Sequence, residues 1–269
     1  MKIIHSLFAL LTLISCVHSK DRVFTASTPA GPEVRSFLGI STKDSIDFIR
    51  WKLVINDRKY SLSCNYGIGK PNTNGFINGG KNLELTGEVT RINYYFKLFN
   101  NKRSLNLLEL NNDLFHFLDE NRNLLVGNGG WSYALNSQAS GTNKKLNFEP
   151  LPSSLADSMT FIGRTPCHWL KEDKDCYKLK WYVILYTNPT TNQPTTYLLK
   201  GSISNHASMQ GSWKISRKSG VEIYQLDTGK NNSQLYFIRL DNNILFFTDI
   251  NGNLLVGDHD FSYALSRTL

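Results

Sequence analysis

Apolar and polar residues alternate along short segments of this chain with a period of two. In the segment RWKLVI the alternation places Trp51, Leu53 and Ile55 on one face, as in a β-strand that is buried on one side. Similar segments, bounded by turn-forming residues, occur at 50–55, 59–64, 83–86, 93–99 and 180–185. Short, regularly spaced strands without a convincing helix are typical of a closed or nearly closed antiparallel barrel, or of a sandwich.

One patterned stretch occurs twice. Residues 105–135 align without a gap with residues 235–265, 130 positions later, and fifteen of the 31 pairs are identical. The identities fall on turn residues, such as Asn112 and Asn242, and on apolar residues, such as Phe117 and Phe247. Turns and core positions define a fold and not a reaction. The chain is therefore a tandem duplication of one all-β domain.

The duplication predicts the domain boundaries. Trp181 in KWYVIL matches Trp51, and the opening Phe-Ile-Gly at 161–163 is matched to the Phe-Leu-Gly at 37–39. Residues 20–36, which precede the first Phe-Leu-Gly and contain Pro and Gly, have the composition of a tether. Residues 137–145 have the composition of a linker. We expect a signal peptide at 1–19, a tether at 20–36, a first barrel at 37–136, a linker at 137–160 and a second barrel at 161–269.

The N-terminus has the pattern of an exported protein. A Lys at position 2 precedes an apolar run at 3–14, which is too short to span a bilayer and resembles a secretory signal peptide. The run ends in Leu-Ile-Ser-Cys, which resembles a bacterial lipobox and makes Cys16 the predicted lipidation site. The alternative is ordinary cleavage after Ser19. We therefore expect an outer-membrane lipoprotein, on the periplasmic or the surface face, or else a secreted protein.

Charge narrows the range of partners. The net charge is +8 and the sequence pI is about 9.2, but the Lys and Arg residues are scattered and form no stripe. Nucleic-acid-binding proteins concentrate their basic residues on one face. The sequence favours a weak attraction to anionic surfaces, such as envelope polysaccharide or lipid head groups, and no nucleic-acid partner.

Two of the four cysteines lie close together in the second copy. By the match above, Gly39 to Trp51 spans 12 positions and Gly163 to Trp181 spans 18, so the loop with Cys167 and Cys176 is longer by six. A disulfide would order such a loop, and export makes oxidation possible. The rival interpretation makes Cys167, His168 and Cys176 ligands for Cu(I) or Zn, although the spacing matches no closed zinc site.

Several motifs together resemble a known family. They are the Phe-Ile-Gly-Arg-Thr-Pro-Cys at 161–167, the Gly-x-Trp at 211–213, and the closing Asp-x-x-Gly-Asn region followed by Tyr263 and Leu265. They resemble the N-terminal domain of the NlpE-type copper-resistance envelope lipoproteins. The resemblance implies a lipocalin-like barrel and roles in envelope stress sensing and copper tolerance. The family's Cys-x-x-Cys is absent, because His168 and Trp169 follow Cys167.

The function expected from the sequence is that of a binding module. Neither a nucleophile elbow nor a Gly-rich phosphate loop is present, so we expect no enzyme and no cofactor, and metal binding stays undetermined. The partners are an unidentified envelope ligand or protein, and a membrane through the N-terminal lipid. The alternatives are a spacer protein that presents loops, a copper-binding resistance protein, and a hydrolase with an interior site.

Overall fold

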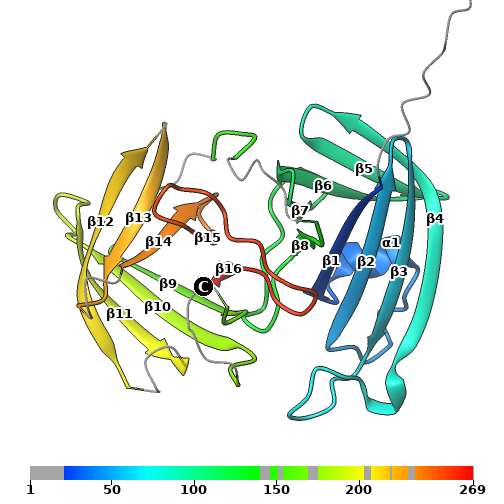
Figure 1. Cartoon of the computed structure of the whole chain (residues 1–269), viewed down its shortest axis with the longest axis horizontal. Coiled ribbons are helices and arrows are strands. Elements are labelled where there is room, and N and C mark those ends of the chain that lie inside the picture. Colours follow the sequence, from blue (N-terminus) through cyan, green and yellow to red (C-terminus); the bar gives the residue numbers. More distant parts are fainter. Residues whose placement is uncertain are drawn as a thin grey trace, which may run out of the picture.

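A computed structural model describes residues 21–139, 146–150, 154–168, 175–202, 207–218, 220–229 and 234–268. The chain forms two closed antiparallel barrels of eight strands each, which lie side by side (Figure 1). The expected all-β fold with two tandem barrels is confirmed. No helix in the described residues has the length and apolar character that a membrane crossing requires.

The first barrel runs from the beginning of the described chain to Ser137. Each strand pairs with the next, and β8 returns to pair with β1. A short helix α1 (Pro32–Leu38) follows the first strand, and a 3₁₀ turn η1 (Ile77–Gly79) precedes the fourth. The strands are β1 (Arg22–Pro29), β2 (Phe48–Asn56), β3 (Lys59–Gly67), β4 (Lys81–Ile92), β5 (Tyr95–Asn100), β6 (Arg103–Asn111), β7 (Leu114–Leu118) and β8 (Ala134–Ser137).

The second barrel repeats this topology and is closed by the pairing of β16 with β9. Its strands are β9 (Ser158–Thr165), β10 (Leu179–Thr187), β11 (Pro194–Gly201), β12 (Met209–Lys218), β13 (Val221–Asp227), β14 (Gln234–Arg239), β15 (Ile244–Thr248) and β16 (Ala264–Arg267).

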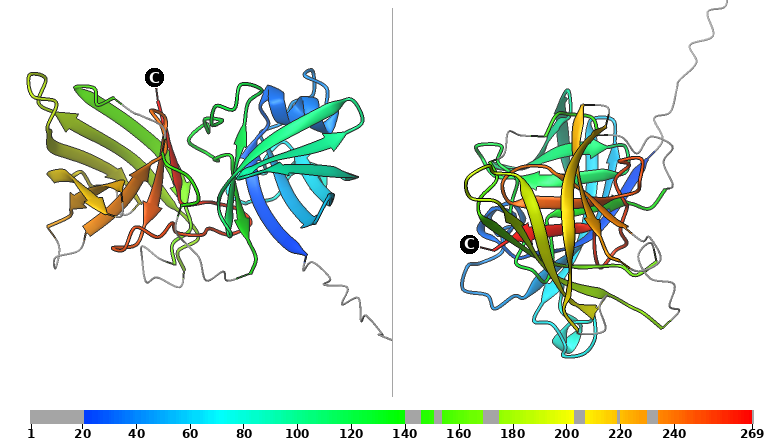
Figure 2. Two further views of the ribbon diagram at one scale, coloured as in Figure 1. Left: turned by 90° about the horizontal axis from the view of Figure 1, so that it is seen from above. Right: turned by 90° about the vertical axis from the view of Figure 1, so that its left-hand side faces the viewer.

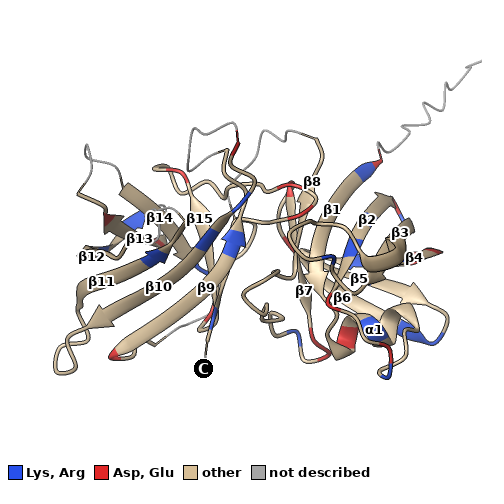
Figure 3. Ribbon diagram, turned by 90° about the horizontal axis from the view of Figure 1, so that it is seen from below, with Lys and Arg blue, Asp and Glu red and all other residues tan. Residues whose placement is uncertain are grey.

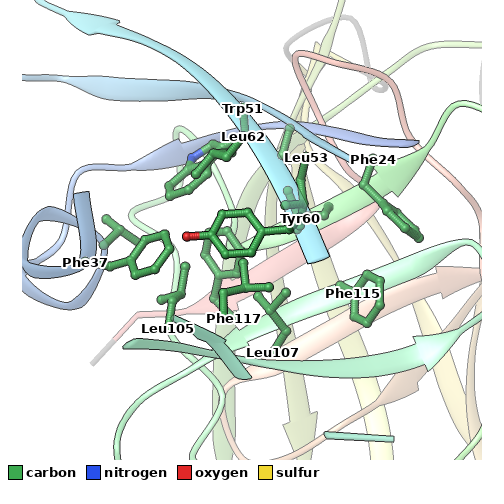
Figure 4. Packing of buried hydrophobic residues seen from close by; sticks show 14 of the residues in the cluster. Phe24, Phe37, Trp51, Leu53, Tyr60, Leu62, Leu105, Leu107, Phe115 and Phe117 are labelled. Carbon is green, nitrogen blue, oxygen red and sulfur yellow. The ribbon is translucent and has the colours of Figure 1, made fainter. Parts of the chain in front are cut away.

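Side chains fill the interior of each barrel. The alternation of RWKLVI points Trp51, Leu53 and Ile55 inward, where all three are almost fully buried. Figure 4 shows rings and branched side chains from several strands packed together in the first barrel, with Phe37 of α1 at one end. A filled interior leaves only the ends of the barrel for ligands.

The same two internal hydrogen bonds hold both barrels. The indole N–H of Trp51 donates to the Thr28 hydroxyl, and that of Trp181 donates to the Thr165 hydroxyl, each at 2.8 Å. In addition, a tyrosine hydroxyl donates over the neighbouring strand to a backbone carbonyl of the strand beyond it, from Tyr60 to Phe99 at 2.9 Å and from Tyr197 to Asp227 at 2.8 Å. These tyrosines lie against Gly87 and Gly211, where a Cβ would clash.

The expected tether at 20–36 is wrong. Residues 22–29 form β1, whose inward side chains Phe24 and Ala26 are buried, and α1 follows directly. Pro32 begins the helix, and Gly39 ends it in the left-handed region with φ 73°. The many Ser, Thr and Pro residues resemble a linker in composition, but the alternating Phe and Ala face a core.

This correction also reverses the comparison of loop lengths. In the sheet register Trp51 pairs with Ala26, and Trp181 pairs with Gly163. The connections are therefore 25 and 18 positions long, by subtraction of the residue numbers, and the first copy has the longer one. The opening at 161–163 corresponds to Phe24–Ala26 and not to 37–39. The disulfide therefore does not compensate for extra length. Cys167 and Cys176 lie in the connection between β9 and β10, which corresponds to the connection between β1 and β2 that contains α1.

The two barrels share a buried apolar interface. This contact was not expected, because the linker composition predicts two separate domains. The strands at this contact, β7 and β15, are buried on both faces, and Figures 1 and 2 show them on the sides where the two barrels face each other. The buried side chains of the interface are Leu108, Leu110, Leu114, Leu118, Leu124, Ala134, Ile223, Ile238, Leu240, Ile244, Phe246, Leu254 and Ala264.

Equivalent residues meet across this interface, as they do in a symmetric dimer. Ser132 and Ser262, which are 130 positions apart, contact each other through their hydroxyls. The Gly127 N–H donates to the Ser266 hydroxyl at 3.0 Å, and reciprocally the Gly257 N–H donates to the Asn136 amide oxygen at 2.8 Å. The tandem chain is therefore built like a dimer whose halves are covalently joined.

A polar cluster around Asp260 adds a second contact between the barrels. The buried Asp260 carboxylate of the second barrel accepts from Arg50 at 2.9 Å and from Asn74 at 2.7 Å, both in the first barrel. The Tyr177 hydroxyl also donates to it. Burial and this hydrogen bond raise the pKa of Tyr177 well above its usual range. The barrels are thus fixed to each other by paired charge as well as by apolar contact.

Candidate ligand site at the open end of the first barrel

The two ends of the first barrel differ. At one end α1 inserts Phe37 into the core, so this end is closed. At the opposite end β1 begins, and the hairpins β2–β3, β4–β5 and β6–β7 turn. No helix is associated with these turns among the described residues. The start of β1, the β2–β3 turn and the β4–β5 hairpin enclose a cavity that opens to solvent.

This cavity, here called the vestibule, has a volume of about 770 Å³. Ile55, Val89 and Phe96 provide its apolar walls. Its charged lining consists of Arg22, Asp57, Arg58, Lys59, Glu88 and Arg91, with Thr90 completing it. Lys and Arg are spread over both barrels (Figure 3), so the vestibule is distinguished by its geometry and not by net charge alone.

A buried carboxylate fixes two of these arginines. Glu109 points inward from β6, and its side chain is 1% exposed. One carboxylate oxygen contacts Arg22 at 2.7 Å, and the other contacts Arg91 at 3.0 Å. Each guanidinium also donates to a turn carbonyl, from Arg22 to Asn112 at 3.0 Å and from Arg91 to Asn93 at 2.9 Å. Both arginines are therefore held in place before any ligand arrives.

Three phenyl rings support the same arginines. Arg22 lies over Phe24 at 5.0 Å and over Phe115 at 5.2 Å, while Arg91 lies over Phe96 at 5.0 Å. Phe115 packs edge-on against both other rings. The negative ring faces favour the guanidinium groups, and the apolar surroundings strengthen that attraction. The floor of the vestibule is thus a rigid assembly of rings and paired charges.

This arrangement is suited to an anion that has an apolar part. A guanidinium group carries five N–H donors, and the contacts described use two on Arg22 and two on Arg91. Fixed, planar donors bind carboxylates and phosphates well. The apolar walls beside them can contact a hydrocarbon chain. The site therefore has the chemistry for an anionic amphiphile.

The sequence-predicted site residues lie elsewhere. Cys16 is outside the described residues. Cys167 and Cys176 form a disulfide, so neither sulfur is a thiolate that could hold Cu(I) or Zn while the bond is intact. His168 lies near Tyr263, with ring centroids 5.7 Å apart. In the described part of the chain, no group of three His, Cys, Asp or Glu side chains could hold a metal ion.

Cys64 points into the core of the first barrel, as its alternating strand predicts. Burial, with Glu84 adding to it, raises the pKa of this thiol well above its usual range. A thiol in such surroundings is unreactive. Its role is that of a small apolar core residue.

The motifs in the sequence do not reveal the vestibule, although one residue is a signal for it. Leu105 and Leu107 point inward from β6, so Glu109 occupies an inward position of an alternating strand. A charge at such a position breaks the pattern and marks a site that needs a partner. The partner Arg22 was assigned to the tether, and Arg91 lies in a strand that was only partly predicted. No sequence rule connected the three residues.

Comparison with known proteins adds no assignment. No protein-family model matches the chain, and neither a curated protein nor a solved structure gives a significant match. The resemblance to the NlpE-type lipoproteins therefore stays a prediction that rests on the motifs described above.

Proposed function

We propose that the protein is an exported, lipid-anchored envelope protein whose first barrel binds an anionic amphiphile, and that it is not an enzyme. The observation that carries the binding role is the Glu109 carboxylate, which holds Arg22 and Arg91 at the base of a 770 Å³ vestibule with apolar walls. Export and anchoring rest on the signal peptide and on Cys16. By binding this ligand, the protein acts as a carrier or as a stress sensor.

The experiment is a calorimetric titration with two probes of equal chain length. Laurate carries a carboxylate, and dodecanol carries only a hydroxyl. We expect laurate to bind and dodecanol to bind at least about tenfold more weakly, because two fixed guanidinium groups face the head group. Equal binding of the two probes, or binding of neither, would show that the vestibule does not select an anion.

Arg91→Ile is the informative variant, since Ile215 occupies the corresponding position of the second barrel. Arg22 still pairs with Glu109 in this variant, so the barrel should fold. We expect laurate affinity to fall about tenfold, while binding of dodecanol is unchanged. Arg217→Ile is the matched control, because Arg217 is an exposed arginine of the second barrel that pairs with Glu222.

A further inference from the structure

The β4–β5 hairpin carries apolar side chains at its tip. Ile92 is 68% exposed, and Tyr94 and Tyr95 are 39% and 36% exposed. Single exposed apolar residues are common on soluble proteins and need no explanation. Three of them at one turn, at the edge of a ligand cavity, form a compact apolar projection.

Basic side chains surround this projection. Arg58 and Lys59 lie at the β2–β3 turn and line the vestibule. On the outer face of the same β4–β5 hairpin, a smaller hollow contains Lys97, Glu120 and Arg122, and Arg122 lies over the Tyr95 ring at 4.9 Å. With Arg22 and Arg91, six cationic side chains line these two cavities, against the carboxylates of Asp57, Glu88 and Glu120. Even with Glu109, which pairs with two of these arginines, the two cavities have more positive than negative side chains.

The chain enters the first barrel at this same end. β1 begins at Arg22, which lines the vestibule. Cys16 is six positions earlier. A fully extended chain spans about 3.5 Å per residue, so a lipid on Cys16 keeps Arg22 within roughly 20 Å of the bilayer surface. A connection this short keeps the start of β1, and with it the open end of the barrel, near the membrane.

We propose that this end of the first barrel docks on the head groups of an anionic lipid bilayer, with Ile92, Tyr94 and Tyr95 entering the interface. Tyrosine is favoured at the depth of the head groups, where its ring is apolar and its hydroxyl is solvated. Arg58 and Lys59 are attracted to anionic lipids. The inference deepens the proposed function, on which it rests for the lipid at Cys16: the vestibule opens onto the membrane, and the amphiphile enters from the bilayer.

A fluorophore at the tip tests this orientation. In the lipidated protein Ile92→Cys can be labelled selectively with nitrobenzoxadiazole, because the Cys16 sulfur carries the lipid, Cys64 is buried and Cys167 is paired with Cys176. The purified full-length product is added to vesicles of phosphatidylcholine with and without phosphatidylglycerol. We expect a blue-shifted and several-fold brighter emission with the anionic vesicles, and a weaker response in high salt, which screens the charges.

Ile250→Cys is the matched control, because Ile250 is 64% exposed and lies in the turn that follows β15 of the second barrel. Its label should not respond. In the Ile92→Cys background, Arg58→Gln together with Lys59→Gln should reduce the response several-fold. An unchanged emission at position 92, or an equal response at position 250, overturns the docking. Laurate titration of the same samples without vesicles separates this failure from a failure of the proposed function, since binding in solution needs no membrane.

Discussion

The two barrels share a scaffold and differ at one end. At the position of Glu109, the second barrel has the equally inward-facing Arg239, so the buried charge is reversed. Arg22 and Arg91 correspond to Met159 and Ile215. The ion-paired floor of the first barrel therefore has no counterpart in the second.

At the equivalent end of the second barrel, the side chains of Arg239 and Trp213 occupy the interior. Arg239 donates to the Ser154 carbonyl at 3.0 Å and to the Asn242 amide oxygen at 2.8 Å. Trp213 replaces Val89 of the first barrel and packs against Tyr224 with ring centroids 5.2 Å apart. Both copies have the same barrel, but among the described residues the arginines paired with a buried carboxylate at this end belong to the first copy. The comparison supports the proposal that the first copy binds the ligand, whereas the second copy provides structural support.

The largest expected difference between the copies concerns these two buried charges. Arg239→Met removes donors from backbone carbonyls that are part-buried, and we expect it to lower the free energy of unfolding by about 3 kcal/mol. Glu109→Gln should cost only about 1 kcal/mol, because Arg22 and Arg91 are 30% and 54% exposed and can be hydrated. Urea unfolding monitored by circular dichroism measures both values.

Glu109→Gln should nevertheless weaken laurate binding, because the arginines lose the carboxylate that positions them. Arg239→Met should leave the laurate affinity of the folded protein unchanged. A greater loss of stability for Glu109→Gln than for Arg239→Met would reverse the assignment of the supporting role.

The interface offers the second comparison, at the twin positions of His116 and Phe246. His116 is fully buried against Phe246, and its Nδ1 has no hydrogen-bond partner among the residues that the structure describes. Burial lowers the pKa of His116 to about 4, although a hydrogen bond with the Leu125 carbonyl opposes this shift. The folded pKa is below the ordinary value of about 6.5, so stability is complete above pH 6.5 and falls as the pH decreases toward 4.

Between pH 7.5 and pH 5 this single group should cost about 2 kcal/mol. His116→Phe, which copies the twin residue, should not carry this part of the pH dependence. Urea midpoints of both proteins across that range give the test, since the remaining histidines contribute equally to each. A stability difference between them that stays constant with pH would show that His116 does not titrate on unfolding.

Much of the fold could be predicted because it is local. The alternation in RWKLVI and the ungapped repeat specify strands and turns, and both barrels have them where expected. The first strand was missed because its Ser, Thr and Pro content matches a linker, and only pairing with β2 and β8 reveals that Phe24 faces a core. The interface is visible in the sequences of β7 and β15, LFHFL and ILFFT. Both are apolar without alternation, because both faces of each strand are buried.

The candidate site was less predictable, since it depends on register. Arg22, Arg91 and Glu109 belong to three different strands, and only the closure of the barrel brings them together. The disulfide was predicted correctly from an incorrect alignment. Proximity of Cys167 and Cys176 was sufficient for that prediction, whereas the comparison of loop lengths depended on identifying β1.

The smallest expected effect concerns what the two barrels share. Trp51 and Trp181 are each almost fully buried and each donate to one threonine. Thr28→Val and Thr165→Val keep the side-chain volume and leave one indole N–H unpaired, which should cost about 1 kcal/mol in either barrel. The exposed Thr86→Val is the control and should change urea stability by less than about 0.5 kcal/mol. Equal losses of unfolding free energy for the Thr28 and Thr165 variants would show that this hydrogen bond supports both barrels alike. The variants of Glu109 and Arg239 are expected to differ. A difference of more than about 1 kcal/mol between the two threonine variants would mean that the barrels have diverged in their cores as well as at their open ends.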